Sequence, residues 1–184
     1  AGFGVASLLL GADPKPRQAA TVDGGAGGAD PLTRAVHVRA ARPHIGEAVI
    51  LSTCNRTEVY AVAEKFHVAY GDIRDFFCEL GNLAPDELHP HLYSQHDDAA
   101  VTHLFEVAAG LDSAVLGESE ILGQVRSAWE VAQHEGSAKS TLNLLFRHAI
   151  ETGKRARTET SIGRGPASGS PAAVAMATHR PGSV

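Results

Sequence analysis

The chain has 184 residues, of which 43% are hydrophobic and 20% charged, and its 16 Lys and Arg against 21 Asp and Glu give a formal net charge of -5. This size and composition are typical of a globular protein of one domain or two small ones, and the acidic balance gives nucleic acid no general attraction, so such a contact needs a local basic patch. No apolar run reaches the roughly 18 residues of a membrane span, and residues 1–16 lack the basic start of a signal peptide. Cys54 and Cys78 lie in different predicted elements, so we expect free thiols in a reducing cytoplasm and no membrane association.

Residues 1–34 differ in composition from the rest of the chain. They are dense in Gly, Pro and Ala and show neither a helical nor a strand period, which predicts a flexible N-terminal arm. The glycine cluster at 24–28 lacks the complete G-x-G-x-x-G pattern and follows no apolar strand. A phosphate-binding loop is therefore not indicated there.

The next segment predicts strands and one helix. Residues 35–41 are strand-like or the end of a helix, residues 47–52 are a short apolar run of the buried-strand type, and residues 57–63 alternate with β-branched and aromatic residues. A helix is predicted over 71–82, with Gly81 as its stop. Its apolar stripe comprises Ile73, Phe76, Phe77 and Leu80, with Cys78 beside it. The polar residues 89–98 are expected to form a connection.

Three amphipathic helices follow. G-L-D-S at 110–113 ends the first, H-E-G-S at 134–137 ends the second, and the third runs from about Ser140 to Thr160. Their apolar stripes comprise Val101, Leu104, Phe105 and Ala108 in the first, Ile121, Leu122, Val125, Trp129 and Ala132 in the second, and Leu142, Leu145, Phe146, Ala149, Ile150 and Gly153 in the third. We predict an α+β fold, with a small β-sheet and helices of βαβ type over 35–96 and an antiparallel helical bundle over 97–165.

Cys54 lies between two predicted strands and is followed at once by Asn55 and Arg56. A cysteine becomes a nucleophile when it is partly exposed and nearby positive charge or hydrogen-bond donors favour its thiolate. Arg56 supplies such a charge, and Thr53 and Asn55 add donors. Alternatively, the planar guanidinium of Arg56 binds a substrate carboxylate beside the sulfur. From spacing alone, a small residue that fills a turn is the commoner explanation of Cys54.

Histidines offer two further possibilities. His89, His91 and His96 are close in sequence, but no C-x-x-C or H-E-x-x-H motif sets a ligand geometry, and a solvated polar loop explains them better than a metal site. His103 falls roughly opposite the apolar stripe of its helix, which predicts an exposed surface residue. Its alternative is a position facing a cleft between sheet and bundle, where histidine suits proton transfer.

Polar residues also gather around the start of the second bundle helix. Glu120 and Gln124 are four residues apart and share a face away from the apolar stripe, and Ser113 and Glu118 precede them in the loop. Residues in such positions are usually only solvated.

Three stretches of the chain together resemble glutamyl-tRNA reductase, the NADPH-dependent oxidoreductase that opens the five-carbon route to tetrapyrroles such as heme. They are LSTCNRTEVYA at 51–61, HLFEVAAGLDSAVLGESEILGQV at 103–125 and LFRHAIETGKRARTETSIGRG at 145–165. The likeness covers about residues 36–178 and implies a catalytic domain over 35–178, followed by a linker within 166–184.

The resemblance implies roles for individual residues. The cysteine of S-T-C-N-R is the family's nucleophile, which maps to Cys54, and the surrounding loop binds the glutamyl group. The loop residues concerned are Thr53, Asn55 and Arg56. His103 is implied to matter for activity, and substrate-contact positions are occupied by Ser113, Glu118, Ser119, Glu120 and Gln124. Many members have E-P-Q where this chain has E-S-E at 118–120, so the contacts of Ser119 and Glu120 carry over less directly.

The implied reaction begins when the Cys54 thiolate attacks the ester carbonyl of glutamyl-tRNA(Glu), which gives an enzyme thioester and frees the tRNA. Hydride from NADPH then yields glutamate-1-semialdehyde. On physical grounds Arg56 suits a substrate carboxylate, Glu118 or Glu120 suits its ammonium, and His103 suits a proton at the leaving oxygen. The resemblance also implies a homodimer and contact with glutamate-1-semialdehyde aminomutase.

Two departures from the family pattern modify these expectations. The family begins with a strand and a G-L-S-H-R-like segment, of which residues 1–34 show nothing, and it continues into NADPH-binding and dimerisation domains. This sequence has no dinucleotide fingerprint, and its last segment reads as cut off. We therefore expect at most esterase-like release of glutamate. The alternatives are a catalytically silent module that binds tRNA or a partner, and a zinc module using Cys54 and the His89 cluster.

Overall fold

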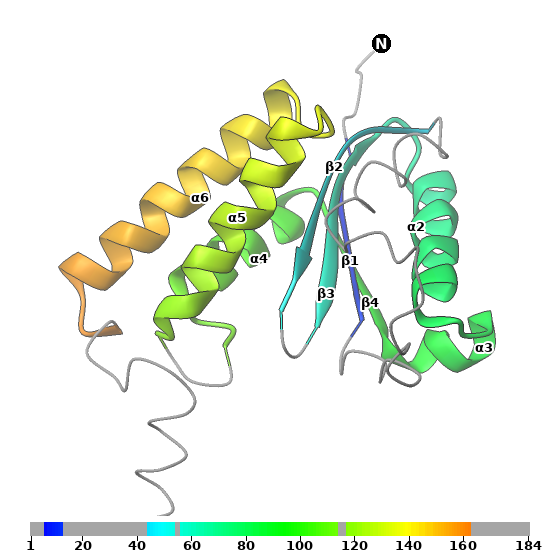
Figure 1. Cartoon of the computed structure of the whole chain (residues 1–184), viewed down its shortest axis with the longest axis horizontal. Helices are drawn as coiled ribbons and strands as arrows, with labels where there is room; N and C mark the ends of the chain where they lie inside the picture. The colour runs from blue at the N-terminus through cyan, green and yellow to red at the C-terminus, as the bar shows by residue number, and fades with distance from the viewer. Residues whose placement is uncertain (1–5, 13–43, 54–55, 114–116, 163–184) are drawn as a thin grey trace, which may run out of the picture.

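The computed structural model describes residues 6–12, 44–53, 56–113 and 117–162. At its centre is a four-stranded sheet with helices on both faces (Figure 1). The strands are β1 (Ala6–Ala12), β2 (Ile45–Ser52), β3 (Thr57–Ala63) and β4 (Leu92–His96), and they lie in the order β2-β3-β1-β4. No helix in these ranges is long and apolar enough to cross a membrane.

The strand pairings confirm the small sheet that was predicted as part of an α+β fold. β2 pairs with β3, β3 with β1, and β1 with β4, each time antiparallel. Because β3 and β4 are both antiparallel to β1, they run parallel to each other with β1 between them. The crossover from β3 to β4 passes through α2 (Phe66–Gly81), α3 (Pro85–Leu88) and a 3-10 turn (His89–His91).

Two sequence predictions are wrong about strands. The arm predicted over 1–34 contains β1, which sits between β3 and β4 in the sheet, so the expectation that this segment lacks a strand fails for residues 6–12. The run A-S-L-L-L-G-A has the apolar centre of an interior strand, but apolar and polar residues do not alternate in it. The Gly- and Pro-rich residues that follow it determined the overall composition of residues 1–34 and so indicated an arm. The predicted connection 89–98 contains β4, whose polar residues suit its place at the edge of the sheet.

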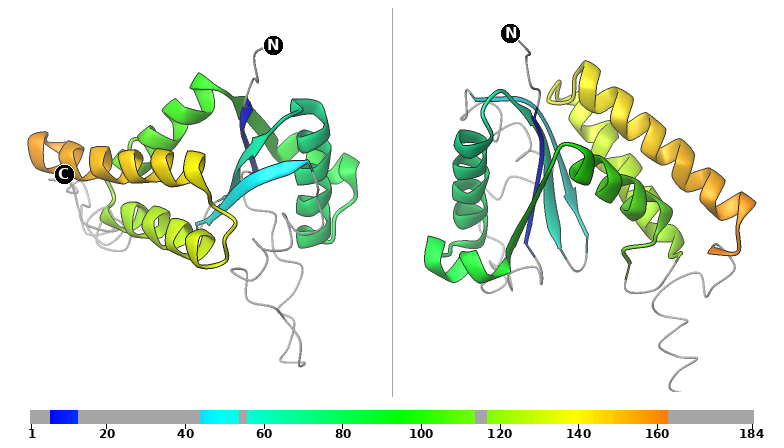
Figure 2. Two further views of the ribbon diagram at one scale, coloured as in Figure 1. Left: turned by 90° about the horizontal axis from the view of Figure 1, so that it is seen from above. Right: turned by 180° about the vertical axis from the view of Figure 1, so that it is seen from behind.

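The sheet divides the molecule into three layers. α2 and α3 cover one face, and α4 (Asp98–Ala109), α5 (Ser119–His134) and α6 (Ser140–Glu159) cover the other (Figures 1 and 2). Successive side chains of a strand point to opposite faces of the sheet, so the strands contribute to the hydrophobic cores on both sides. Facing the three-helix side, Val49, Leu51 and Tyr60 join the larger core, whereas Val59 and Ala61 pack with α2.

The predicted helices are confirmed, with shifts at their ends. α2 begins at Phe66, earlier than predicted, and Gly81 is its last residue rather than its stop, because Asn82 takes the left-handed conformation that ends the helix (φ 49°). Cys78 is half-buried against the α2 core, as its position beside the stripe suggests. α4 ends at Gly110, whose φ is 80°. The strand or helix end predicted over 35–41 lies outside the described residues.

Close helix packing explains one residue of the predicted α6 stripe. A Cβ added to Gly153 would lie 2.5 Å from the carbonyl oxygen of Ala108, so only glycine allows α6 to cross α4 this closely. Between α5 and α6, the Trp129 indole donates a hydrogen bond to Asn143 (2.8 Å). Tyr60 of β3 meets Phe146 of α6 edge to face, with ring centroids 5.4 Å apart.

A buried carboxylate from the sheet caps α6. Glu47, in β2, accepts hydrogen bonds from the backbone N–H groups of Lys139 (2.9 Å), Thr141 (3.1 Å) and Leu142 (2.9 Å). These groups belong to the first turn of the helix, where N–H groups have no partner within the helix and the helix dipole favours negative charge. Glu47 therefore ties the start of α6 to the edge strand of the sheet.

Candidate active site

The predicted nucleophile belongs to the loop of the β2–β3 hairpin. Cys54 and Asn55 lie outside the described residues, and Thr53 and Arg56 on either side of them close the loop. The Thr53 N–H donates to the carbonyl of Arg56 (2.9 Å), and the Thr53 hydroxyl contacts both the N–H and the carbonyl of Arg56 (3.1 Å each). Thr53 is therefore a structural partner of Arg56 whatever it does for substrate.

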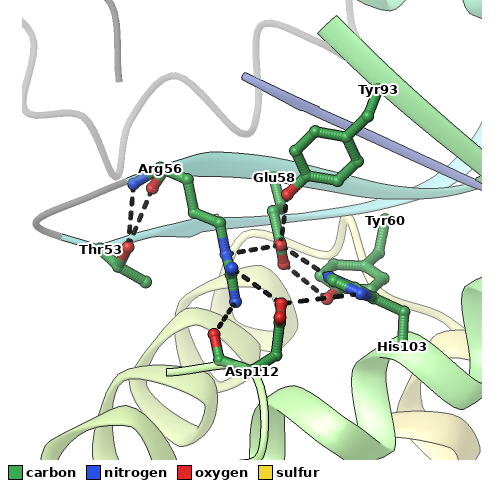
Figure 3. A network of polar contacts seen from close by, with 7 residues as sticks. All are labelled: Thr53, Arg56, Glu58, Tyr60, Tyr93, His103 and Asp112. Atoms are coloured by element: carbon green, nitrogen blue, oxygen red, sulfur yellow. Dashed lines mark hydrogen bonds and ion pairs between the residues drawn. The ribbon is translucent and has the colours of Figure 1, made fainter. Parts of the chain in front are cut away.

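Arg56 points away from the hairpin and toward the loop after α4 (Figure 3). Its Nε lies 2.9 Å from Glu58 Oε1, its Nη1 lies 2.8 Å from Asp112 Oδ2, and its Nη2 donates to the Asp112 carbonyl (3.1 Å). Only 14% of its side chain is exposed, against 43% for Asp112. Among the described residues, Asp112 thus engages both terminal nitrogens of the fork, whereas Nε is paired with Glu58 by charge and not by a hydrogen bond.

Glu58 is the common acceptor of this cluster, although its side chain is 0% exposed. It receives hydrogen bonds from the Tyr60 hydroxyl (2.6 Å), the Tyr93 hydroxyl (2.7 Å) and His103 Nε2 (2.8 Å), besides the ion pair with Arg56. We define these five residues with Asp112 as the Glu58 network. It joins β3, β4, α4 and the loop after α4 (Figure 3).

The pKa values of Glu58, Tyr60, Tyr93 and Arg56 are shifted by their burial and by one another. Burial alone would raise the pKa of Glu58, but the hydrogen bonds from His103, Tyr60 and Tyr93 lower it overall, so the carboxylate is ionised. Burial and the neighbouring Glu58 raise the pKa of Tyr60 and Tyr93, so both phenols remain donors. Burial would lower the pKa of Arg56, but Glu58, Tyr93, Asp112 and Tyr60 together outweigh it and raise that pKa.

The prediction that His103 is an exposed surface residue is wrong. It is 7% exposed and lies on the buried face of α4, between that helix and the sheet. A histidine is stable there because Glu58 accepts from its Nε2, which the apolar period of the helix alone does not reveal. Its Nδ1 lies 3.9 Å from Asp112 Oδ2, on the side of the Arg56 fork. The alternative reading, a residue between sheet and bundle, describes its place.

The remaining predicted residues lie nearby in sequence but outside the network. Ser113 follows Asp112 and is half-buried; Glu118 is half-buried and precedes α5; on that helix Glu120 is exposed and Gln124 half-buried. The side chain of Ser119 lies outside the described residues. Among the contacts of the described residues, none joins Glu118, Glu120 or Gln124 to Arg56 or Glu58, so their roles toward substrate stay predictions.

Sequence reasoning missed four members of the network: Glu58, Tyr60, Tyr93 and Asp112. Two of them carried a signal, because Glu58 and Tyr60 alternate onto one face of a strand otherwise built of apolar residues. An acidic residue on such a face requires a buried partner. Tyr93 and Asp112 gave no comparable signal, since their contacts depend on the β1–β4 pairing and on the loop after α4.

The histidines considered for a metal site are all exposed. His89 and His91 lie on the 3-10 turn, and His96 ends β4, where it contacts Asp97 (3.4 Å). Within the described ranges, no three His, Cys, Asp or Glu side chains form a group that could hold a metal ion. Cys54, the other member of the zinc hypothesis, lies outside those ranges.

Comparison with known proteins shows which family of proteins this chain resembles. Residues 20–160 match the family model "Glutamyl-tRNAGlu reductase, N-terminal domain". A glutamyl-tRNA reductase of Frankia alni is 44% identical over 155 residues, which are 84% of this chain and 33% of the relative. That of Bacillus subtilis is 47% identical over 131 residues, 71% of this chain and 29% of the relative. The chain thus spans about a third of the length of these curated relatives.

A solved structure shows the same fold. The glutamyl-tRNA reductase from Methanopyrus kandleri superposes with a TM-score of 0.67 at 32% sequence identity, over 93% of this chain and 39% of that chain.

Proposed function

The chain belongs to the glutamyl-tRNA reductase family, whose N-terminal domain it contains, and from this premise we propose that Cys54 accepts glutamate from glutamyl-tRNA(Glu) as a thioester. The observation that carries the proposal is Arg56. The guanidinium is held two residues after Cys54 by Glu58 and Asp112. A positive charge held there favours a thiolate, and the planar fork of a guanidinium suits a substrate carboxylate.

The step balances without an added reagent. The thiolate attacks the ester carbonyl, the C–S bond forms as the C–O bond breaks, and the 3′ oxygen of the tRNA leaves and takes a proton. We assign that proton to His103. Glu58 holds its Nε2, which leaves Nδ1 on the side of Arg56 and Asp112 to exchange a proton with the reacting groups.

The family's reaction also includes reduction by NADPH, but the described residues do not fit that cofactor. A dinucleotide fold places a glycine-rich turn between a parallel strand and the helix that follows it. Here β3 leads to α2 through Glu64 and Lys65, with no glycine, and β3 pairs antiparallel with both neighbours. We expect the thioester on this chain to hydrolyse to glutamate whether or not NADPH is added.

The experiment is incubation of the 184-residue chain with labelled glutamyl-tRNA, without NADPH, followed by intact-protein mass analysis. We expect one glutamyl adduct in the parent chain and none in Cys54→Ser. Cys78→Ser is the matched control, because burial raises the pKa of the Cys78 thiol. That residue packs against the α2 core and is distant in sequence from the loop that holds Cys54. This variant should retain the adduct.

An adduct that persists in Cys54→Ser would refute the assignment of the nucleophile. A parent chain that binds glutamyl-tRNA but never forms the adduct would favour the catalytically silent binding module instead. The homodimer and the contact with the aminomutase stay predictions from the family likeness.

A further inference from the structure

Arg157 lies near the end of α6. Its contacts reach beyond the end of its own helix, where a cation usually interacts. Its Nη1 donates to the carbonyl oxygens of Ala108 (2.7 Å) and Gly153 (2.9 Å), and its Nη2 donates to the carbonyl oxygen of Glu118 (2.9 Å). Ala108 lies in the last turn of α4 and Glu118 directly precedes α5. One guanidinium therefore holds both ends of the connection between these helices.

A backbone hydrogen bond also joins the beginning of this connection to its end. The Gly117 N–H donates to the carbonyl of Gly110 (2.9 Å), and both glycines have left-handed backbone, with φ of 77° and 80°. A Cβ added to Gly117 would lie 1.9 Å from the carbonyl oxygen of Ile162, just after α6. Arg157 in the last turn of α6 and Ile162, three residues after the helix, thus support this connection from one side.

This connection carries the residues that meet the candidate site. Asp112 holds two nitrogens of Arg56 and faces His103, and Ser113 and Glu118 are predicted substrate contacts. Asp112 is 43% exposed and gains little support from burial, so its position depends on Arg56 and on the backbone that carries it. Arg157 contacts that backbone at both ends.

The chemistry of Arg157 agrees with such a task. Among the described residues no carboxylate forms an ion pair with it, and burial lowers its pKa. Its charge is thus directed at carbonyl oxygens alone. By contrast Arg155, two residues earlier, is exposed and pairs with Glu159 (2.9 Å) in the ordinary manner of a helix surface.

We propose that Arg157 is a positioning residue, which fixes the backbone at Ala108 and Glu118, the two ends of the connection, and thereby holds Asp112 against Arg56. Its effect on glutamyl transfer rests on the proposed function, but its effect on the connection does not. The test therefore has one readout for each. Arg157→Gln removes the charge and the forked donor, and Arg155→Gln is the matched control on the same helix.

The first readout is hydrogen exchange of the Gly117 amide, without substrate. Loss of charge-assisted hydrogen bonds worth about 1.5 kcal/mol or more should speed exchange by about tenfold in Arg157→Gln. Amides in the middle of α4 should keep their protection, which shows that the fold persists, and Arg155→Gln should match the parent. Unchanged Gly117 exchange in Arg157→Gln would overturn the proposal whatever the chain's activity.

The second readout is the dependence of adduct formation on glutamyl-tRNA concentration. We expect Arg157→Gln to raise the half-saturating concentration about tenfold. Faster exchange with unaltered adduct formation would contradict the role in positioning Asp112. If the parent forms no adduct, the proposed function fails, and the exchange result still decides whether Arg157 fixes the connection.

Discussion

Glu58 is a charged side chain with no exposed surface, and such a group is stable only when its acceptor positions are occupied. Two phenols and an imidazole donate hydrogen bonds to it, and the Arg56 guanidinium adds an ion pair. The consequence for the candidate site is orientation. Arg56 and His103 each contact Glu58 and face Asp112, so the two groups proposed to assist Cys54 have fixed places before any substrate binds.

Replacement of Glu58 by Gln should therefore damage both stability and chemistry. The amide keeps the shape but loses the charge that balances Arg56, and breaking a buried ion pair costs about 3–5 kcal/mol. We expect a lower free energy of unfolding in urea and at least a tenfold slower formation of the glutamyl adduct, since Arg56 and His103 lose their common partner. Glu106→Gln, on the exposed side of α4, is the control and should change neither. An E58Q variant as stable as the parent would show that the network is not an ionic one.

Part of this site could be predicted from residues alone. The S-T-C-N-R stretch located the loop, and Thr53 and Arg56 do close it. The environment of His103 could not be predicted, because a helical period assigns a polar residue to solvent unless its partner is known. That partner, Glu58, is distant in sequence and becomes visible only when β3 and α4 face each other.

At the scale of elements, the first turn of α6 depends on a strand for its cap. Lys139 occupies the N-cap position without a side-chain hydrogen bond of its own, and the Glu47 carboxylate takes over from β2. Sequence patterns predicted the extent of α6 well, because its apolar stripe is long and regular. They gave no sign of the cap, since the usual signature is a local Ser, Thr, Asp or Asn side chain and this acceptor comes from another layer.

Glu47 makes the stability of this junction depend on pH. Burial would raise its pKa, but the backbone hydrogen bonds from Leu142, Lys139 and Thr141 lower it below the ordinary value. A carboxyl whose pKa is lower in the folded state stabilises fully above its unfolded pKa, and this contribution is lost as pH falls through the folded pKa. We expect the difference in free energy of unfolding between the parent and Glu47→Gln, about 1–3 kcal/mol at neutral pH, to shrink in acid.

The measurement is urea unfolding of both proteins over a series of pH values from neutral downward. Glu106→Gln serves again as the exposed control and should follow the parent at every pH. A difference between the parent and E47Q that stays constant into acid would mean that the charge of Glu47 contributes nothing beyond its shape.

At the scale of the whole molecule, the sequence predicted the helical layers better than the sheet. A long amphipathic helix can be predicted from the helical spacing of apolar residues within a single segment, and all three bundle helices were confirmed. The sheet depends on pairings between distant segments, and two of its four strands, β1 and β4, fall in stretches whose composition indicated an arm and a polar connection. An interior strand without alternation and a polar edge strand both lack the pattern that sequence reasoning uses.

The three layers should nevertheless unfold as one unit, because both cores share the same central sheet. β2 and β3 send alternate side chains into each core, so neither helical layer can leave without exposing one face of the sheet. Trp129, the single tryptophan, lies in α5 and contacts α6, so it reports on the three-helix side of the sheet. Phe77→Leu, in the α2 core on the opposite face, should lower the free energy of unfolding by about 1 kcal/mol and shift the Trp129 fluorescence transition as much as the far-ultraviolet circular dichroism.

Val68→Ala on the exposed side of α2 is the control, and both of its transitions should stay within about 0.5 kcal/mol of the parent. If Phe77→Leu moved the dichroism while Trp129 fluorescence kept its parental midpoint, the bundle would be an independent folding unit. Glu47 and the Glu58 network would then be contacts between two separately stable parts. Coincident shifts would mean that a defect behind the sheet reaches the residues around Arg56 through loss of the common fold.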